Sequence, residues 1–555
     1  MNKDHSTATA SLENLYRIFT VSEAPDSKLG VLDQEISDNL ADFLRTRIVA
    51  QDKNLAAIEE DFSEASIPEQ PQFVSEYTEF LLDKLVAQSV HTTAPGFIGH
   101  MAAPLPYFML PLSKIMIALN QNLVKIETSK AFTPLERQVL AMLHQLIYQQ
   151  DENYYQQWMH DSNYSLGAFC SGGTVANITA LWAARNRLFA ATDDFPGIAR
   201  LGLSGAMQQL GYRGLAVLIS RRGHYSFGKA IDLLGIGRDN LIAIDTDEDN
   251  RIDCTQLRQR CQQLQDSGIK VLAIIGIAGT TETGNIDPLD TLADIAEEYH
   301  CHYHVDAAWG GPTLFSDTYR PLLKGIERAD SVTIDAHKQL YVPMGCGMVL
   351  FKDNTAVHHI EHHAEYIIRR GSKDLGSHTL EGSRPGMAML VHAGFYIIGR
   401  RGYEILIDSN IEKTQKFAAM IEHHPDFELV AKPELNILAY RFAPAAVQQK
   451  LLLQGHETRS AINNELDHIT RTLQKNQRAA GKSFVSRTSL NPSKYDGEKI
   501  TVFRVVLANP LTNTDHLQAI LSEQLRLSCS DELAPRLALL QGLIETDGIA
   551  ADNSP

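Results

Sequence analysis

The sequence predicts an α/β protein built on a mainly parallel sheet, with a helical segment before it and a smaller α+β region after it. Three observations support this. Strand-like and helix-like blocks alternate from Gly214 onward, the 555 residues suffice for two or three domains, and the blocks become shorter beyond Gly402. Alternating β-α-β units form sheets covered by helices on both faces, and such sheets bind ligands at the carboxyl ends of their strands.

The alternating region presents its elements in a regular order. Strand-like apolar runs lie at 215–220, 241–245, 271–278, 304–306, 331–338 and 345–351, and helix-like runs lie at 226–234, 254–264 and 288–299. The last helix has a recognisable start, with Asp287 expected as its N-cap and Pro288 at its first position. These blocks predict the sheet of the central domain.

The flanking regions differ from this pattern. Residues 1–110 are expected to form an N-terminal helical segment, and 111–402 the large domain with the sheet. Residues 403–544 contain strand-like runs at 435–442 and 500–508 around a polar helix at 459–478, which predicts a small α+β domain. The tail at 545–555 is expected to be disordered.

Charge and hydropathy favour a cytoplasmic protein that binds a small molecule. The net charge is -17 and the isoelectric point is near 5.6, which opposes binding to nucleic acid or to an anionic membrane. Met1 to Thr20 has no apolar core of a signal peptide, and no apolar stretch is long enough to cross a bilayer.

The cysteines and histidines predict neither disulfides nor a metal site. The six cysteines are widely scattered and are expected to be reduced. A cluster of four histidines, His358, His359, His362 and His363, is expected to be a surface feature, because no Cys or Asp completes a ligand set.

A lysine and a carboxylate stand at the ends of two expected strands. Lys338 ends the run that begins at Ser331, and Asp306 ends the run that begins at His304. A lysine can hold pyridoxal phosphate (PLP) as a Schiff base, and a carboxylate can pair with the protonated pyridine nitrogen so that the ring withdraws electrons. The pair therefore suggests PLP as the cofactor, although a structural ion pair in a binding protein would use the same residues.

Three further motifs suit a phosphorylated, flat cofactor. Ser171, Gly172 and Gly173 open the helical run at 178–188, so that backbone amides can approach an anion. His224 lies just past a strand and could stack on a ring, although a helix cap is the commoner use of such a residue. Thr280 ends another strand and supplies a hydroxyl group.

These motifs occur in an order that resembles the group II PLP-dependent amino acid decarboxylases, which include glutamate, aromatic amino acid and cysteine sulfinate decarboxylases. The resemblance runs from about Pro95 to Pro510. It implies the PLP-dependent transferase fold type I, an obligate homodimer in which the N-terminal segment 1–110 takes part, and a Schiff base at Lys338. It also implies ring contacts for three residues and phosphate contacts for three more. The ring residues are His224 above one face, Ala308 against the other face and Asp306 at the nitrogen, and the phosphate residues are Ser171, Gly172 and His337.

The resemblance also assigns residues that act on the substrate. Arg384, in Gly382-Ser383-Arg384, matches the segment that grips the α-carboxylate. Tyr366 matches a mobile-loop tyrosine that protonates the α-carbon after carbon dioxide leaves. Lys338 and Asp306 alone are equally compatible with transamination, so the prediction of decarboxylation depends on Arg384, Tyr366 and the family pattern.

The substrate prediction depends on the segment 96–101. Glutamate decarboxylases of the family carry Phe-Asn-Gln where this chain has Gly99 and His100. That segment and the runs at 122–127 and 380–386 look most like the bacterial aspartate 1-decarboxylases, which make β-alanine for pantothenate and coenzyme A. The resemblance thus implies α-decarboxylation of L-aspartate, with His100 and Lys125 as candidates to face the β-carboxylate. Asp335, where animal members have Asn, leaves the phosphate contacts there open.

Several alternatives remain. The nearest are decarboxylases of L-glutamate, cysteine sulfinate or 2,4-diaminobutyrate. A PLP aminotransferase or carbon-sulfur lyase would use the same fold. A catalytically silent α/β binding protein would purify without colour and stay colourless with added PLP.

Overall fold

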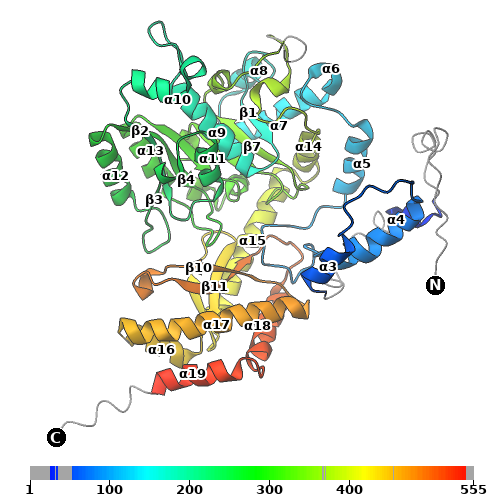
Figure 1. Ribbon diagram of the computed structural model, residues 1–555, viewed down its shortest axis with the longest axis vertical. Coiled ribbons are helices and arrows are strands. Elements are labelled where there is room, and N and C mark those ends of the chain that lie inside the picture. Colours follow the sequence, from blue (N-terminus) through cyan, green and yellow to red (C-terminus); the bar gives the residue numbers. More distant parts are fainter. Residues whose placement is uncertain are drawn as a thin grey trace.

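The computed structural model describes residues 25–31, 33–34, 53–364, 368, 371–453 and 455–545. Figure 1 shows two lobes joined through one long helix, with the N-terminal helices on one side. The larger lobe holds the seven-stranded sheet, and the smaller lobe holds a separate four-stranded sheet. This confirms the expected combination of a large α/β unit and a smaller α+β unit.

The large sheet has the strand order β1-β7-β6-β5-β4-β2-β3. Its strands are β1 (Gly167–Cys170), β2 (Gly214–Ser220), β3 (Leu241–Ile244), β4 (Ile269–Ile277), β5 (His302–Asp306), β6 (Ser331–Asp335) and β7 (Gly347–Phe351). The pairs among β3, β2, β4, β5 and β6 are parallel, whereas β7 runs antiparallel to both β6 and β1. The sheet is therefore mainly parallel, and the sequence predicted its central strands to within a few residues.

Helices cover both faces of this sheet, as connections between parallel strands require. The helices of this lobe include α7 (Phe132–Tyr148), α8 (Glu152–Trp158), α9 (Gly173–Leu188), α10 (Ile198–Gln209), α11 (Ser226–Leu233), α12 (Cys254–Asp266), α13 (Leu289–Glu298) and α14 (Ala388–Ile397). Of these, α7, α9, α11, α12 and α13 pack directly on strands of the sheet. The interiors of the central strands are largely apolar and buried, as Val305 and Ile274 illustrate with exposures of 0%. Burial of such side chains on two faces holds the sheet rigid beneath the strand ends.

The small lobe contains an antiparallel sheet of order β10-β11-β9-β8. Its strands are β8 (Phe427–Ala431), β9 (Ile437–Phe442), β10 (Ser486–Leu490) and β11 (Ile500–Val506), and its helices are α16 (Ala445–Leu453), α17 (His456–Ala480), α18 (Thr514–Ser528) and α19 (Ala534–Glu545). The α17 helix packs on β11 and matches the predicted polar helix.

The helix α15 (Gly399–Glu422) connects the lobes. It contacts the segment Gly311–Phe315 of the large lobe and β8 of the small lobe. The hydroxyl group of Tyr403 donates to the carbonyl oxygen of Leu340 at 3.1 Å. The division of the chain at 402/403 therefore falls inside a continuous helix, and the four domain limits remain predictions.

The N-terminal part contains α3 (Leu55–Asp61), α4 (Val74–Phe80), α5 (Met109–Leu119) and α6 (Ile126–Ser129). Shorter 3-10 or π segments of the chain are Leu81–Leu85, Val86–Gln88, Arg238–Asn240, Gly311–Phe315, Arg320–Leu323, Ile326–Arg328, Ala356–His359, Leu375–His378 and Ser493–Tyr495. The expectations for residues 1–24 and for the tail at 546–555 lie outside the described residues. Within the described ranges, no helix is both long and apolar enough to span a membrane.

One expected helix start is wrong. Pro288, not Asp287, occupies the N-cap position of α13, and no side chain caps that helix. The carboxylate of Asp287 instead accepts the backbone N–H groups of Ile252 at 2.8 Å and Ile277 at 2.9 Å. Asp287 is 2% exposed, so these backbone donors, out of reach of water, compete successfully for its oxygens.

Candidate active site

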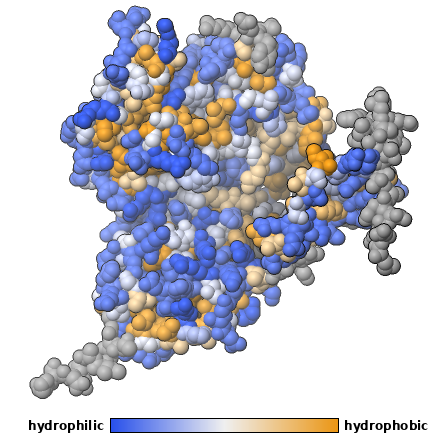
Figure 2. Space-filling view, in the orientation of Figure 1, coloured by the Kyte–Doolittle hydropathy of each residue, from blue (hydrophilic) through white to orange (hydrophobic). Residues whose placement is uncertain are grey.

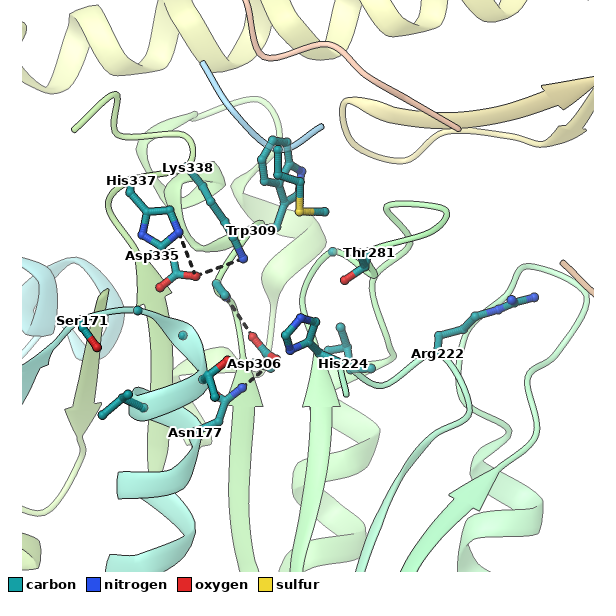
Figure 3. A pocket seen from close by; sticks show the side chains of 18 residues that line it. Ser171, Asn177, Arg222, His224, Thr281, Asp306, Trp309, Asp335, His337 and Lys338 are labelled. Carbon is teal, nitrogen blue, oxygen red and sulfur yellow. Dashed lines mark hydrogen bonds and ion pairs between the residues drawn. The ribbon is translucent and has the colours of Figure 1, made fainter. Parts of the chain in front are cut away.

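A cavity of about 320 Å³ opens at the carboxyl ends of β2, β4, β5 and β6. Parallel strands end on the same edge of a sheet, so they bring residues far apart in sequence to one place. Eight residues predicted for the site line this cavity: Ser171, Gly172, Gly173, His224, Asp306, Ala308, His337 and Lys338. Figure 3 shows Ser171 at one end of the cavity, Thr281 and Arg222 at the other, and Lys338, Asp306 and His224 between them.

Asp306 ends β5 and is held in place by two donors. The side-chain amide of Asn177, on α9, donates to Oδ2 at 3.1 Å, and the backbone N–H of Ala308 donates to Oδ1 at 3.1 Å. Asp306 is 7% exposed. Fixed donors orient the carboxylate toward a positively charged partner in the cavity.

Asn177 is a member of a larger polar network that the sequence did not reveal. Its amide also donates to Ser226 Oγ at 3.1 Å, and its carbonyl oxygen lies 3.1 Å from Nε2 of the buried His304. Ser226 Oγ in turn lies 2.9 Å from Nδ1 of His224. The network therefore links the imidazole of His224 to the carboxylate of Asp306. The position of Asn177, one turn into α9 after the Ser-Gly-Gly turn, is the sequence signal for it.

His224 is held beside the cavity in a largely buried position. Burial lowers the pKa of its imidazole, while the Asp306 carboxylate acts in the opposite direction. A neutral imidazole presents a flat ring face at this position, which suits stacking on another ring.

Lys338 lies three residues beyond β6 and carries an ion pair. Its Nζ is 3.0 Å from Oδ2 of Asp335, whose side chain is 3% exposed. The other oxygen of Asp335 is buried and has no hydrogen-bond partner among the described residues. His337 Nδ1 lies 2.9 Å from the carbonyl oxygen of Cys346, which orients the ring toward the cavity edge.

The turn before α9 is built for close approach of other groups. Gly173 is the first residue of this helix, and a Cβ atom there would lie 2.7 Å from Asp335 Oδ2. Only glycine is compatible with that contact. The N-terminus of a 16-residue helix carries partial positive charge and free N–H groups, so the turn suits an anion such as a phosphate.

Five predicted residues do not line the cavity or lie outside the described part of the chain. Thr280 is buried, and its Oγ1 hydrogen bonds Thr283 Oγ1 at 2.8 Å; its neighbour Thr281 lines the cavity instead. Arg384 makes a two-pronged ion pair with Glu136, whose side chain is 1% exposed. Tyr366 falls among the residues that are not described.

The two residues expected near the β-carboxylate are also off the cavity wall. Lys125 precedes α6 and pairs with Glu127. His100 stacks against Phe97 and Phe484, with ring centroids 6.1 and 5.6 Å apart. Burial and the nearby Arg504 lower the pKa of His100. The neighbouring Met101 does line the cavity.

Arg504 is a residue that the sequence reasoning missed. It lies in β11, and its guanidinium donates to the carbonyl oxygens of Gly99 at 2.8 Å and Thr281 at 3.2 Å. It also donates to Ser486 Oγ at 3.0 Å. These acceptors are neutral, and one belongs to a residue of the cavity wall. A single arginine inside the otherwise apolar run Val502-Phe503-Arg504-Val505 was the available signal.

The histidine cluster does not form a metal site in the described part of the chain. His358 and His359 lie in the short segment Ala356–His359, and Nε2 of His358 approaches the carbonyl oxygen of Asn163. Within the described residues, no group of three or more His, Cys, Asp or Glu side chains could hold a metal ion.

The residues present fit PLP as a cofactor. An amine, an oriented carboxylate, a flat imidazole and a helix N-terminus line one cavity, and they match the aldehyde, ring nitrogen, ring face and phosphate of that molecule. One buried oxygen of Asp335, beside Lys338, has no hydrogen-bond partner among the described residues, which indicates that these residues alone do not satisfy every polar group here.

Comparison with known proteins agrees with this reading. A model described as the pyridoxal-dependent decarboxylase conserved domain matches residues 58–443. The aspartate 1-decarboxylase of Aliivibrio fischeri is 59% identical over 98% of this chain and 99% of its own, and the L-2,4-diaminobutyrate decarboxylase of Rhizobium meliloti is 28% identical over 77% and 76%. The crystal structure of mouse CSAD in apo form superposes with a TM-score of 0.77 at 24% identity, covering 90% of this chain and 98% of that one. The chain belongs to the pyridoxal-dependent decarboxylase family.

Proposed function

We propose that this chain removes the α-carboxylate of L-aspartate, with PLP as cofactor, to give β-alanine and carbon dioxide. The assignment of aspartate as the substrate rests on the 59% identity to an aspartate 1-decarboxylase across nearly the whole of both chains. Relatives named for other amino acids are far less similar, as the 28% identity of the diaminobutyrate enzyme illustrates.

In this proposal each cavity residue has one task. Lys338 supplies the amine that holds the cofactor's aldehyde carbon, and Asp306, fixed by Asn177 and Ala308, keeps the ring nitrogen protonated. PLP, when bound, withdraws the electrons released from the α-carbon. His224 and Ala308 would contact opposite faces of the ring, and Ser171, Gly172, Gly173 and His337 would hold the phosphate. Thr280, whose buried hydroxyl group hydrogen bonds Thr283, would support the loop that carries the wall residue Thr281.

Two arginines are candidates for the substrate α-carboxylate. The family resemblance favours Arg384, but its guanidinium is already engaged by the buried carboxylate of Glu136. Among the described residues, Arg504 donates hydrogen bonds to neutral acceptors only, beside the wall residue Thr281, although the charge of the nearby Glu282 carboxylate also acts on it. We therefore favour Arg504, because a guanidinium that donates to no carboxylate can exchange weak acceptors for a substrate carboxylate.

The remaining substrate roles follow the family pattern. Tyr366 is proposed to return a proton to the α-carbon. His100 is proposed to face the β-carboxylate, supported by its closeness to Arg504, whereas Lys125 is the weaker candidate because Glu127 already neutralises it.

The functional unit is proposed to be a cytoplasmic homodimer whose product feeds pantothenate and coenzyme A synthesis. Support for a dimer comes from exposed apolar side chains on α5 and α14, including Ile117 at 69% and Tyr396 at 64% exposure. Figure 2 shows apolar residues along α5 at the edge of the molecule. Apolar patches of this kind are typical of subunit interfaces.

The test is an assay of the purified protein with PLP and, separately, L-aspartate, L-glutamate, L-cysteine sulfinate and L-2,4-diaminobutyrate. Carbon dioxide is measured and each amine identified, with Lys338→Ala as the blank. Formation of β-alanine that disappears in the variant supports the proposal. Release of carbon dioxide from another substrate overturns only the assignment of aspartate as the substrate. Bound yellow cofactor without carbon dioxide would indicate an aminotransferase or carbon-sulfur lyase, and a colourless protein would indicate a silent binding protein.

A further inference from the structure

The anion-binding turn before α9 already contacts a carboxylate of the same chain. The backbone N–H of Ser171 lies 3.3 Å from both Oε1 and Oε2 of Glu381, which is 210 residues away in the sequence. Ser171 lines the cavity at the end opposite Thr281 and Arg222. An acidic side chain therefore accepts from one of the N–H groups that an anionic ligand would need.

Glu381 is brought there by a loop that is fixed on both sides. Before it, the backbone N–H of Gly376 donates to the carbonyl oxygen of Val124 at 3.2 Å. After it, the carbonyl oxygen of Arg384 accepts from Leu123 N–H at 3.0 Å, and the Arg384 side chain pairs with Glu136. The contact at Ser171 is thus held by anchors outside the cavity, and Glu381 sits at the part of the loop between them.

Charge around the turn favours exchange over simultaneous binding. Glu381 forms no ion pair within the described part of the chain. The second carboxylate, Asp335, lies against Gly173 on the same turn and pairs with Lys338. A phosphate ester carries about -1.5 to -2 charges at neutral pH. A phosphate beside Ser171 would therefore repel Glu381 as well as compete with it for the N–H group.

We propose that Glu381 is an internal competitor of the cofactor phosphate, which occupies the Ser171 N–H in the cofactor-free protein and must leave it when PLP binds. This inference rests on the proposed function, because it takes the turn at Ser171 as the phosphate site. Before PLP binds, the Glu381 carboxylate accepts the N–H group at the start of the helix. Breaking this contact costs free energy, so the net affinity for the phosphate is lower by that amount.

The test compares PLP with pyridoxal, which has the same aldehyde and ring but no phosphate. Cofactor-free wild type, Glu381→Gln and Glu381→Ala are titrated with each ligand, and the absorbance of the bound ligand gives equilibrium dissociation constants. Glu422→Gln, an equal change of charge at an exposed position of α15, is the control. Melting temperatures of all variants verify that they fold.

The expected result is a PLP dissociation constant roughly tenfold lower in both Glu381 variants, as for loss of one charge-assisted hydrogen bond that competes with the ligand. The constant for pyridoxal is unchanged, and the control matches wild type. An unchanged or weakened PLP affinity, or an equal gain for pyridoxal, overturns the inference.

The same titration separates this inference from the proposed function. If wild type binds no PLP, or if Lys338→Ala binds it with the same absorbance, the proposed cofactor chemistry fails. If wild type binds PLP through Lys338 and the ratio of the two dissociation constants is the same in every variant, only the competitor role of Glu381 fails.

Discussion

The Nζ atom of Lys338 lies 3.0 Å from Oδ2 of Asp335, and the same carboxylate packs against the first residue of α9. Asp335 therefore connects the proposed cofactor-binding lysine with the proposed phosphate turn. It is buried, and one of its oxygens lacks a partner in the described part of the chain. Groups so placed are sensitive to small displacements, because a buried charge that loses its partner is costly.

A methyl group at Gly173 should disrupt this arrangement. In Gly173→Ala the new Cβ would meet Asp335 Oδ2 at 2.7 Å, so the carboxylate or the turn must shift. We expect the dissociation constant of PLP to rise roughly tenfold or more, and the free energy of unfolding to fall by about 1 to 3 kcal/mol. Gly172→Ala is the control, because its Cβ would be 3.6 Å from the nearest atom, in His337. Equal effects of the two substitutions on PLP affinity would contradict this account.

Loss of the Asn177 amide should weaken the proposed role of Asp306. Asn177→Ala removes the donor to Asp306 Oδ2. It also takes one hydrogen bond each from Ser226, which keeps its contact with His224, and from His304, which keeps its contact with Ser331. We expect kcat to fall about 10- to 100-fold, as is typical when a supporting hydrogen bond to a site residue is removed. The absorbance of bound cofactor should shift as well. Asn186→Ala is the control, because Asn186 lies on the same helix but donates to His359. This variant should keep the wild-type kcat and cofactor absorbance.

The two candidate arginines give opposite expectations. Arg504→Lys keeps the charge but loses the planar fork, so KM for L-aspartate should rise about tenfold or more while the melting temperature changes little. Arg384→Lys breaks the two-pronged pair with buried Glu136, so the melting temperature should fall while KM is retained. The reverse pattern, with KM raised by Arg384→Lys only, would restore Arg384 as the carboxylate ligand.

These arginines also illustrate what a sequence can predict. Lys338 and Asp306 were found because strand ends in a parallel sheet converge, and that follows from local periodicity alone. Arg504 was missed because it reaches Thr281 and Gly99 across the boundary between the two lobes, a contact that no local pattern encodes. The Glu136 partner of Arg384 is 248 residues away, so the sequence offered no reason to expect that the guanidinium is already engaged.

Distant contacts also explain why Asp287 was misassigned: it looked like an N-cap beside Pro288 but accepts N–H groups from Ile252 and Ile277 instead.

Burial raises the pKa of the Asp287 carboxyl group from 3.8 to about 7, although both N–H donors act in the opposite direction. The pKa in the folded protein therefore exceeds that in the unfolded chain. The folded state binds the proton more tightly, so the associated stability is fully present below about pH 3.8 and is lost as the pH rises through about 7.

Asp287→Asn removes this proton-linked contribution and should change the pH dependence of stability. The amide can accept only one of the two backbone N–H groups, so the variant should be less stable than wild type at pH 5. At pH 8 wild type holds an ionised buried carboxylate, and the difference should shrink or change sign. Melting temperatures of both proteins between pH 5 and pH 8 check this.

Asp253→Asn is the control, because Asp253 also accepts two backbone N–H groups but does so at the exposed start of α12. The change that this control shows measures the general effect of an Asp-to-Asn substitution, which is subtracted. All other titrating groups are common to wild type and variant, so only Asp287 can make their difference in melting temperature depend on pH. If that difference stays constant between pH 5 and pH 8, Asp287 does not retain its proton in the folded protein.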